Sequence, residues 1–360
     1  MDPRILPADS DARILRPCRH SSSHQTRRDP SAAQAQASRH LLTSTPFSQT
    51  WGGALHSIRS PCQSQHREEE TMARPHIEPF CDRDVPFKKM TLPGFPSGMH
   101  YKMLSLDKDT GACTMTVQFD AGYRQPPGFS YSDIELLIME GGLRVGDEMC
   151  GPGTYFFIPA GVALPAVSTK TGCLALLMYN QTEPNFVESD EDGDGADRSR
   201  LIQVNAYDDL SWQVPTLMPA TAPGCLLKIL RWDEVTGALS FLYCMVPGFW
   251  QDNISFHDCA EEAYHIWGTS WIMQFGDLPT GGYFWRPPYI NHGPFASEHG
   301  ILAFGRTDGE LYNHFHFNPY TTLKENREWA AEKLKHRKPA LFKWIVAHEH
   351  NHLTGSELKK

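Results

Sequence analysis

The chain has 360 residues, of which 40% are hydrophobic and 21% are charged, and its formal net charge at pH 7 is −9. This length accommodates one large or two ordinary domains with packed cores. The acidic balance argues against nucleic acid as a partner. No apolar run approaches the roughly 18 residues of a membrane-spanning helix, so we expect no membrane partner either.

Residues 1–75 differ in composition from the rest of the chain. Residues 1–60 are rich in Arg and Ser, contain no Lys or Glu, and show no sustained hydrophobic periodicity. This composition is typical of a disordered extension or of an organelle-targeting leader. A third interpretation is a protein that starts at Met72. We expect this segment to lie outside the folded part of the chain.

Residues 76–187 contain short segments that are typical of β-strands. They are rich in aliphatic, β-branched and aromatic residues, and Gly, Pro and Asp separate them; they span residues 112–119, 135–140, 154–159 and 173–179. No helical pattern lies between them, which favours a β-sandwich or a β-barrel.

An acidic linker at 188–200 leads to a second segment, 201–320, which repeats the first. The string "DTGACTMTVQFDAGY" at 109–123 aligns with "VTGALSFLYCMVPGF" at 235–249. Further along, "GPGTYFFIPAGVALPAV" at 151–167 aligns with "PTGGYFWRPPYINHGPF" at 279–295. The offset grows slightly along the chain, as insertions in loops would cause. Two copies of one β-unit are therefore predicted.

The C-terminal residues 321–360 have a helical pattern that Pro339 interrupts. We expect Trp329, Leu334 and Trp344 to pack on a barrel or on a partner chain. The nine cysteines are scattered and form no C-x-x-C pair. Such cysteines are typical of reduced thiols in a cytoplasmic protein.

The repeated unit resembles the cupin superfamily. Gly248 followed by "FHDCAEEAYHIWG" is similar to the first cupin motif, and "GGYFWRPPYINHGPF" is similar to the second. The resemblance covers residues 95–320 and extends to the cupin branch that includes the sensor half of zinc-dependent anti-sigma factors. It implies an all-β fold of two tandem cupin (jelly-roll) β-barrels with a C-terminal helical segment. It also implies a homodimer, because cupin sheet edges commonly pair.

The resemblance places metal ligands in the second copy, at His257, at His292 and at a neighbouring glutamate. The first histidine of the family pattern falls on Ser255. Two imidazoles and a carboxylate from different strands can hold one face of an ion and leave the other face open. We therefore predict a divalent cation, with Fe²⁺ favoured and Zn²⁺, Mn²⁺ or Ni²⁺ also suited to these ligands.

The carboxylate ligand is Glu262 or Glu261, which point to opposite faces of a strand. The repeat pairs Glu262 with Glu135, and a shared inward carboxylate favours Glu262. The spacing to Gly268 favours Glu261 instead. We take Glu262 as the predicted ligand and leave Glu261 as the alternative.

The first copy lacks this set of ligands. Its two histidine positions are occupied by Ser130 and Leu164, and only Glu135 remains. A lone carboxylate among apolar groups does not hold a divalent ion. We expect the first barrel to be metal-free and to serve packing, dimerisation or pocket closure.

Four further residues are candidates for substrate chemistry. Tyr264 shares a strand face with Glu262, so we predict that it donates a hydrogen bond to substrate. His314 and His316 also share a face, which points either into the barrel or to an interface. Tyr264 and His316 are the predicted catalytic residues. Arg286 would anchor a carboxylate if it pointed inward.

These motifs favour a metal-dependent enzyme, foremost a non-haem Fe(II) dioxygenase that acts on a small organic molecule. Two alternatives stay open. One is an isomerase, lyase or hydrolase that uses Mn, Zn or Ni. The other is a non-catalytic sensor that binds a metal or a small ligand.

Overall fold

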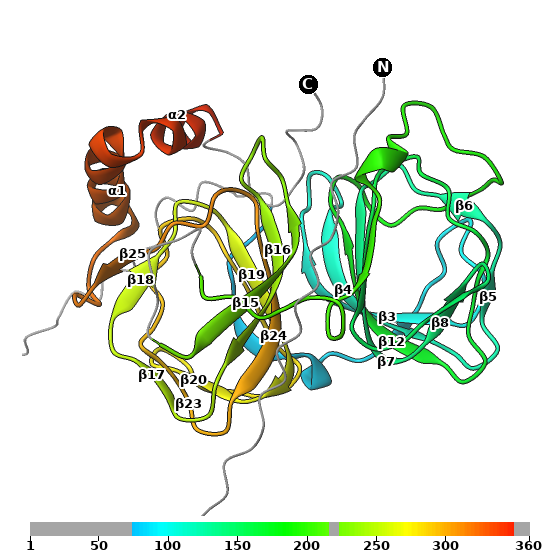
Figure 1. Ribbon diagram of the computed structural model, residues 1–360, viewed down its shortest axis with the longest axis horizontal. Helices are drawn as coiled ribbons and strands as arrows, with labels where there is room; N and C mark the ends of the chain where they lie inside the picture. The colour runs from blue at the N-terminus through cyan, green and yellow to red at the C-terminus, as the bar shows by residue number, and fades with distance from the viewer. Residues whose placement is uncertain (1–73, 216–222, 349–360) are drawn as a thin grey trace, which may run out of the picture. The chain divides into compact units, whose positions relative to one another are not determined.

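The computed structural model describes residues 74–215 and 223–348. Nearly all of the predicted N-terminal extension, and the end of the predicted C-terminal tail, lie outside the described residues. Within them, antiparallel β-strands are the predominant secondary structure, and two α-helices follow near the C-terminus (Figure 1). The predicted all-β fold with a C-terminal helical segment is confirmed.

The first barrel consists of two antiparallel sheets. In spatial order, the seven-stranded sheet contains β14 (Ile202–Asn205), β10 (Thr154–Ile158), β7 (Ile134–Gly141), β12 (Cys173–Tyr179), β4 (Cys113–Phe119), β3 (Met99–Leu106) and β2 (Lys88–Lys89). The four-stranded sheet contains β5 (Arg124–Gln125), β11 (Val167–Ser168), β8 (Leu143–Val145) and β9 (Glu148–Cys150). One short pair, β6 (Gly128–Phe129) with β13 (Val187–Glu188), lies beside them.

The second barrel repeats this plan. Its six-stranded sheet contains β1 (Ile77–Cys81), β22 (Gly282–Arg286), β19 (Glu261–Gly268), β24 (Ile301–Thr307), β16 (Leu239–Met245) and β15 (Cys225–Trp232). Its four-stranded sheet contains β17 (Phe249–Gln251), β23 (Phe295–Ser297), β20 (Ser270–Ile272) and β21 (Gly276–Leu278). The short pair is β18 (Ile254–Phe256) with β25 (His314–His316).

Strand register shows how closely the two copies correspond. In the first barrel Ile134 is opposite Ile158, and in the second Glu261 is opposite Arg286. An isolated bridge joins Gly128 to Leu164 in the first barrel and Ser255 to His292 in the second. These pairings assign structural counterparts residue by residue, and they agree with the repeat found in the sequence.

Two edge strands are exchanged between the barrels. β1 precedes the first barrel in the chain but pairs with β22 of the second, where Ile77 is opposite Trp285. β14 follows the acidic linker but pairs with β10 of the first barrel, where Thr154 is opposite Asn205. The predicted boundaries at 76 and 201 therefore assign each of these strands to the wrong barrel.

Side chains on the two faces of the central strands belong to two separate apolar cores. One face of β7 carries Leu136 and Ile138, which pack inside the first barrel. The other face carries Leu137, which packs with Tyr155, Tyr264 and other aromatic residues of both barrels. Apolar side chains thus line the interior of the first barrel and form the contact between the barrels, because successive strand residues face opposite sides.

Glu135 and Glu262 lie between the barrels, where burial of an unpaired carboxylate would be costly. Glu262 accepts hydrogen bonds from Tyr283 of its own barrel (2.5 Å) and from Thr114 of the other barrel (2.9 Å). Glu135 likewise accepts from Tyr155 (2.7 Å) and, across the contact, from Ser240 (2.5 Å). Because the two sets of donors are structural counterparts, the contact has an approximate two-fold arrangement.

Arg306 pairs with both buried glutamates, and Arg74 also pairs with Glu262 at 3.3 Å. The Nε of Arg306 bonds Glu262, and its Nη1 lies 3.2 Å from Glu135 Oε1. Burial alone would raise the pKa of each carboxyl. Arg306 and the arginines and hydroxyl groups near each glutamate outweigh burial, so both pKa values are lowered. The pair of glutamates that the repeat shares therefore joins the barrels.

The C-terminal helices lie against the second barrel near β18 and β25 (Figure 1). Helix α1 (Leu323–Arg337) begins with a capping box formed by Thr322 and Glu325, and it buries Asn326, Ala330 and Leu334. Helix α2 (Pro339–Ala347) begins at a proline, which suits the first turn. A Cβ at Gly309 would lie 2.4 Å from the ring of Trp344, so only glycine permits this contact.

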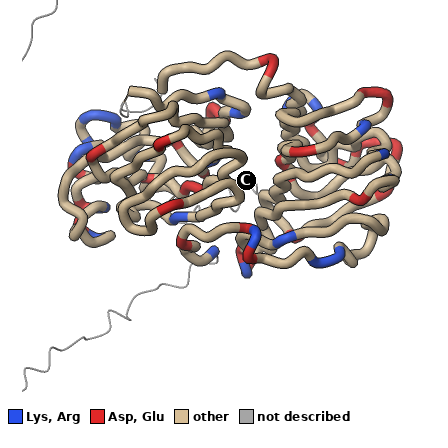
Figure 2. Tube along the Cα trace, turned by 90° about the horizontal axis from the view of Figure 1, so that it is seen from below, with Lys and Arg blue, Asp and Glu red and all other residues tan. Residues whose placement is uncertain are grey.

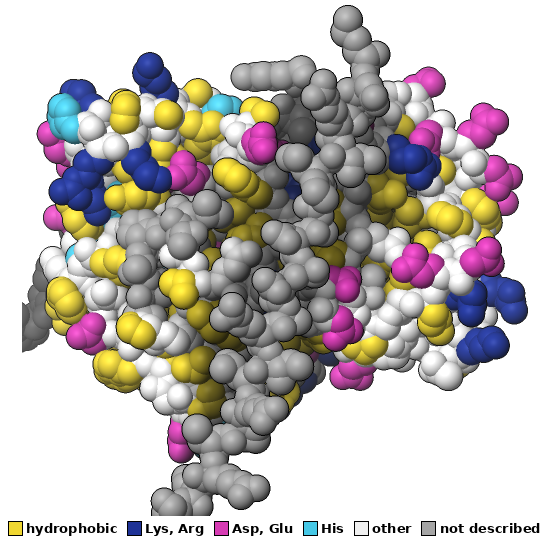
Figure 3. All heavy atoms as spheres, viewed as in Figure 1, with side chains coloured by type: hydrophobic (Ala, Val, Ile, Leu, Met, Phe, Trp, Pro, Cys, Tyr) yellow, Lys and Arg dark blue, Asp and Glu magenta, His cyan; other side chains and the backbone are white. Residues whose placement is uncertain are grey.

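Charged side chains are distributed along both barrels. Figure 2 shows acidic and basic residues interspersed on the two sets of strands. Figure 3 shows basic side chains gathered over helix α1, whose outer face is largely charged, and small groups of hydrophobic side chains elsewhere on the visible face.

Neither described helix has the length and apolar character required to span a membrane.

Candidate metal centre

Two histidines and a glutamate come together at one end of the second barrel. His257 follows β18, Glu261 begins β19, and His292 lies in the loop between β22 and β23. Their ligand atoms lie within 4.8 Å of one another, and they form the one cluster of three or more candidate ligands among the described residues.

The distances within the cluster match a shared cation. His257 Nε2 is 3.4 Å and His292 Nε2 is 3.9 Å from Glu261 Oε2. Metal–ligand bonds of about 2.0–2.2 Å place two donors on one ion roughly 3–4 Å apart. The residues therefore fit a divalent cation without rearrangement of the strands.

Backbone hydrogen bonds hold the histidine loops in place. Ser255 and His292 exchange two N–H···O=C bonds of 2.9 Å, and the Tyr289 N–H donates to the His257 carbonyl at 2.8 Å. Tyr289, which follows Pro287-Pro288, has a φ of 68°, a sparsely populated value for a residue with a side chain. The proline pair and these bonds together set the position of His292.

The tautomer of His292 suits metal binding. Its Nδ1 lies 3.0 Å from the Ile290 carbonyl oxygen, which can only accept, so Nδ1 carries the proton. Nε2 then has a lone pair directed at Glu261, and a hydrogen bond from the other ring nitrogen is the usual arrangement for a histidine ligand. The Ser255 hydroxyl is 3.3 Å from the same Nε2.

The charge states also suit a cation. Burial alone would raise the pKa of Glu261, but His257, His292 and Arg286 outweigh burial and hold it at about 2. Burial, with the nearby His257 and Arg286, lowers the pKa of His292 well below its usual value. At neutral pH the centre thus offers an ionised carboxylate and a neutral imidazole.

Access to the cluster is restricted. The side chains of His257 and His292 are 7% and 5% exposed, whereas the side chain of Glu261 is 16% exposed. Solvent therefore reaches the centre mainly beside the glutamate.

Arg286 lies on the same strand face as Glu261, directly opposite it in the sheet. It is 2% exposed, and its Nε and Nη1 have no hydrogen-bond partner in the described part of the chain. Its guanidinium lies 4.6 Å from the centre of the Phe284 ring, inside the barrel. A buried guanidinium with unused donors beside a candidate metal centre is suited to an anionic group.

The structure corrects the choice of carboxylate. Glu262 points to the opposite face of β19, into the contact between the barrels, where Arg306 and Tyr283 bond it. Alternation predicted opposite directions for the two glutamates correctly, but the residue shared with the first barrel is the one at the barrel contact. The spacing to Gly268 was the sequence signal that identified Glu261.

The other predicted catalytic residues lie away from the cluster. Tyr264 does share the face of Glu262, so it also points between the barrels, and its hydroxyl donates to Asp82 at 3.0 Å. His316 bonds Asn291 (3.0 Å) and lies against Trp329 of helix α1. His314, on the same face, bonds Asp258 at 2.6 Å. Neither histidine of β25 belongs to the cluster.

A comparison with a solved structure supports this fold. A crystal structure of a proposed dioxygenase from Nostoc punctiforme has 21% sequence identity and a TM-score of 0.61, and the match covers 66% of this chain and 88% of that chain. Oxalate decarboxylase from Bacillus subtilis, solved at pH 4.6, has 10% identity and a TM-score of 0.46 over 71% of this chain and 80% of that chain. No curated protein matches the chain.

The matching family model is Domain of unknown function (DUF4437), and it covers residues 96–314. This range runs from the approach to β3 in the first barrel to β25 in the second, which is more than half of the chain. The chain therefore belongs to the DUF4437 family.

Proposed function

We propose that the chain is a metal-dependent cupin enzyme that acts on a small organic substrate in its second barrel. The observation that carries this proposal is the cluster of His257, Glu261 and His292, whose donor atoms lie within 4.8 Å of one another. Glu261 replaces Glu262 as the proposed carboxylate ligand.

Within this class, a non-haem Fe(II) dioxygenase is the favoured reaction type. Two histidines and one carboxylate occupy one face of a metal and leave positions for substrate and dioxygen. When bound, Fe²⁺ would supply Lewis acidity and activation of dioxygen. The same ligands accept Mn²⁺, Zn²⁺ or Ni²⁺, which would support isomerase, lyase or hydrolase chemistry instead.

The residues around the centre define the substrate class. Arg286 presents unused N–H donors next to Glu261, so it orients the anionic group of a substrate, most simply a carboxylate. Phe284 and Phe295 belong to the apolar group of residues within this barrel, and they exclude water from the remainder of the substrate. The proposed substrate is therefore a small organic anion.

The test is metal analysis of anaerobically purified protein together with oxygen uptake. The native chain should hold a near-stoichiometric divalent metal, and His292→Ala should lose it because two ligands seldom retain such an ion. His316→Ala is the matched control, since that histidine lies outside the cluster, and it should keep the metal. A native protein that stays metal-free under every loading condition would overturn the proposal.

A second candidate function is a non-catalytic sensor of metal, related to the anti-sigma branch of cupins. The observation that favours it is the burial of His257 and His292, which are 6% and 4% exposed. Tightly held zinc, without oxygen uptake or turnover of small organic anions, would support the sensor over the enzyme. A homodimer and a cytoplasmic location remain predictions.

A further inference from the structure

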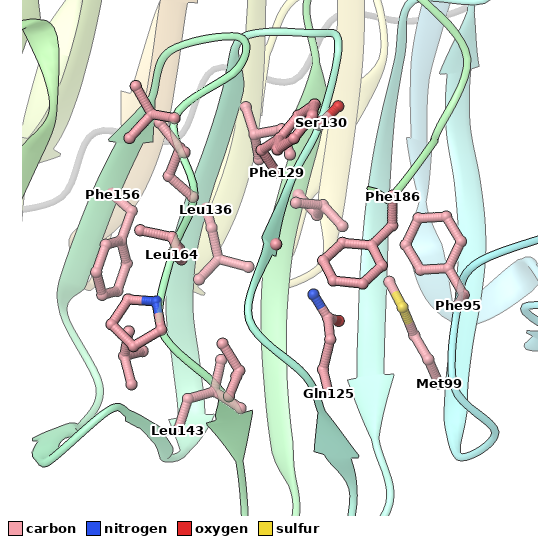
Figure 4. Close-up of a pocket in the computed structure, with 18 of the residues that line it drawn as sticks. Phe95, Met99, Gln125, Phe129, Ser130, Leu136, Leu143, Phe156, Leu164 and Phe186 are labelled. Atoms are coloured by element: carbon pink, nitrogen blue, oxygen red, sulfur yellow. The ribbon is translucent and has the colours of Figure 1, made fainter. Parts of the chain in front are cut away.

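A cavity of about 100 Å³ lies inside the first barrel. Its wall is made mainly of aliphatic and aromatic side chains, and Figure 4 shows them around a common space between the strands, including Phe95, Met99, Phe129, Leu136, Leu143, Phe156, Leu164 and Phe186. Strands of both sheets of the barrel contribute to the wall. The cavity therefore belongs to the barrel interior and not to the contact between the barrels.

This cavity occupies the place that the candidate metal centre has in the second barrel. The strand pairings make Ile134 the counterpart of Glu261, and Leu164 the counterpart of His292. By the same register Ser130 is the counterpart of His257. All three line the cavity. The first barrel has thus lost every ligand and retains a hollow at the same position.

The chemistry of the wall excludes charged ligands. None of the residues that line the cavity is Asp, Glu, Lys, Arg or His. The counterpart of Arg286 is Ile158, which also lines it. A charged molecule would lose its hydration here without compensation.

Gln125 places a polar amide within the mainly apolar wall. Gln125 accepts a hydrogen bond from the Tyr123 hydroxyl (2.7 Å) through its Oε1. Its Nε2 makes no hydrogen bond to the described part of the chain, and Figure 4 shows its amide end pointing toward the middle of the lining side chains. Three other polar side chains line the wall: Ser130 donates to Asn185 (3.0 Å), Asn185 donates to Thr182 (2.8 Å), and Tyr179 adds its hydroxyl. Gln125 can therefore donate to an oxygen of a ligand.

We propose that the first barrel binds a small uncharged molecule, with an apolar body about the size of a benzene ring and an oxygen that accepts from Gln125. An engineered apolar cavity of ~150 Å³ stays dry and binds benzene, which sets the scale. Water would lack partners over most of this wall, so an apolar occupant gains both contacts and burial. The site is independent of the proposed metal chemistry.

The experiment uses the full chain, with and without chelator, and three probes of similar size: benzene, benzyl alcohol and benzoate. Methionine methyl groups are labelled with ¹³C, and the signals of Met99, which lines the cavity, and Met273, in the second barrel, are assigned by single Met→Leu substitutions. Benzene and benzyl alcohol should shift the Met99 signal and leave Met273 unchanged, with the same result after metal removal. Benzoate should bind at least about tenfold more weakly than benzyl alcohol, because the wall has no cation to pair with it.

Two variants sharpen the result. Leu164→Phe fills the cavity and should weaken binding of both uncharged probes about tenfold or more, whereas His292→Ala, at the equivalent position of the other barrel, should leave it unchanged. Gln125→Leu should reduce the preference for benzyl alcohol over benzene several-fold. An unchanged Met99 signal in the native protein with every probe would overturn the proposal, as would equal binding of benzoate and benzyl alcohol. If Leu164→Phe does not fold, the Met99 signal of the native protein and the binding preference of Gln125→Leu still test the proposal.

Discussion

The two barrels share one strand plan and differ in what their interiors contain. The second barrel has His257, Glu261 and His292 at one end, and at the equivalent positions the first has Ser130, Ile134 and Leu164. What the barrels share lies elsewhere, in the contact that joins them, where each contributes one buried glutamate. In this chain, the glutamate common to the two copies lies in the contact between the barrels, where Arg306 of the second copy pairs with both, and residues that differ define the candidate sites.

This comparison can be tested by placing first-barrel residues in the second barrel. The register makes Met178 the counterpart of Arg306, because each is opposite one of the two buried glutamates. Similarly, Ile138 is the counterpart of His265, and Ile158 is the counterpart of Arg286. Each exchange removes one charged or titratable group from the second barrel. It introduces the apolar side chain that occupies the equivalent position of the first barrel.

The largest loss of stability is expected for Arg306→Met. This change leaves Glu135 and Glu262 buried without the guanidinium that both contact, so the free energy of unfolding should fall by about 3–5 kcal/mol. Chemical denaturation measures it. Arg198→Met is the control, because its ion pair with Asp192 is about half exposed on the arginine side and should contribute less than about 1 kcal/mol. Equal effects of the two changes would show that the network does not join the barrels.

His265→Ile is expected to change how the stability of the folded protein depends on pH. Burial lowers the pKa of His265 from 6.5 to about 4 in the folded protein. Between these values the unfolded chain binds a proton that the folded chain does not, so stability falls as the pH drops from about 6.5 to 4, by up to about 3 kcal/mol.

The measurement is denaturation of both proteins at pH 7 and at pH 4.5. The variant should lose less stability on acidification than the native chain, because it no longer carries the group that titrates. The same loss in both proteins would mean that His265 does not control the acid response. His336→Ala, an exposed helix residue, is the control.

A smaller effect is expected for Arg286→Ile, in the affinity of the metal-loaded protein for small carboxylates. The change removes the unused donors beside Glu261, and binding of organic anions should weaken about tenfold or more, since a hydrogen bond to a charged group contributes roughly 1.5–3 kcal/mol. Calorimetric titration measures it. Arg231→Ile is a matched control, because that arginine pairs with Asp233 away from the cluster. Unaltered anion binding would remove Arg286 from the proposed site.

The sequence predicted the fold well because its repeat is dense in glycines and in short β-rich segments. The exchange of β1 and β14 was not predictable, since pairing partners of edge strands depend on where the barrels meet. Glu262 was wrongly predicted as a metal ligand and Tyr264 as a substrate contact for the same reason, since both lie where the barrels meet. Alternation showed correctly that they share a face, but only the contact between the barrels shows which face is inside.

Histidines were a second source of error. His316 has the spacing from His314 of a ligand pair, yet both rings pack against Phe256 and Trp329 beneath helix α1. His265, which the cluster does not include, is 1% exposed and bonds the Leu278 carbonyl at 3.0 Å. The spacing motif around Pro287 identified His292 because the motif fixes a loop as well as a residue.

Metal content of Glu261→Gln compared with Glu262→Gln is the most direct measurement of the central claim, which is that the unshared glutamate holds the cation and the shared one holds the barrels together. Glu261→Gln should purify with little metal and near-native stability. Glu262→Gln should keep its metal and unfold at lower denaturant concentration. The reverse pattern, metal lost with Glu262 and kept without Glu261, would contradict the account.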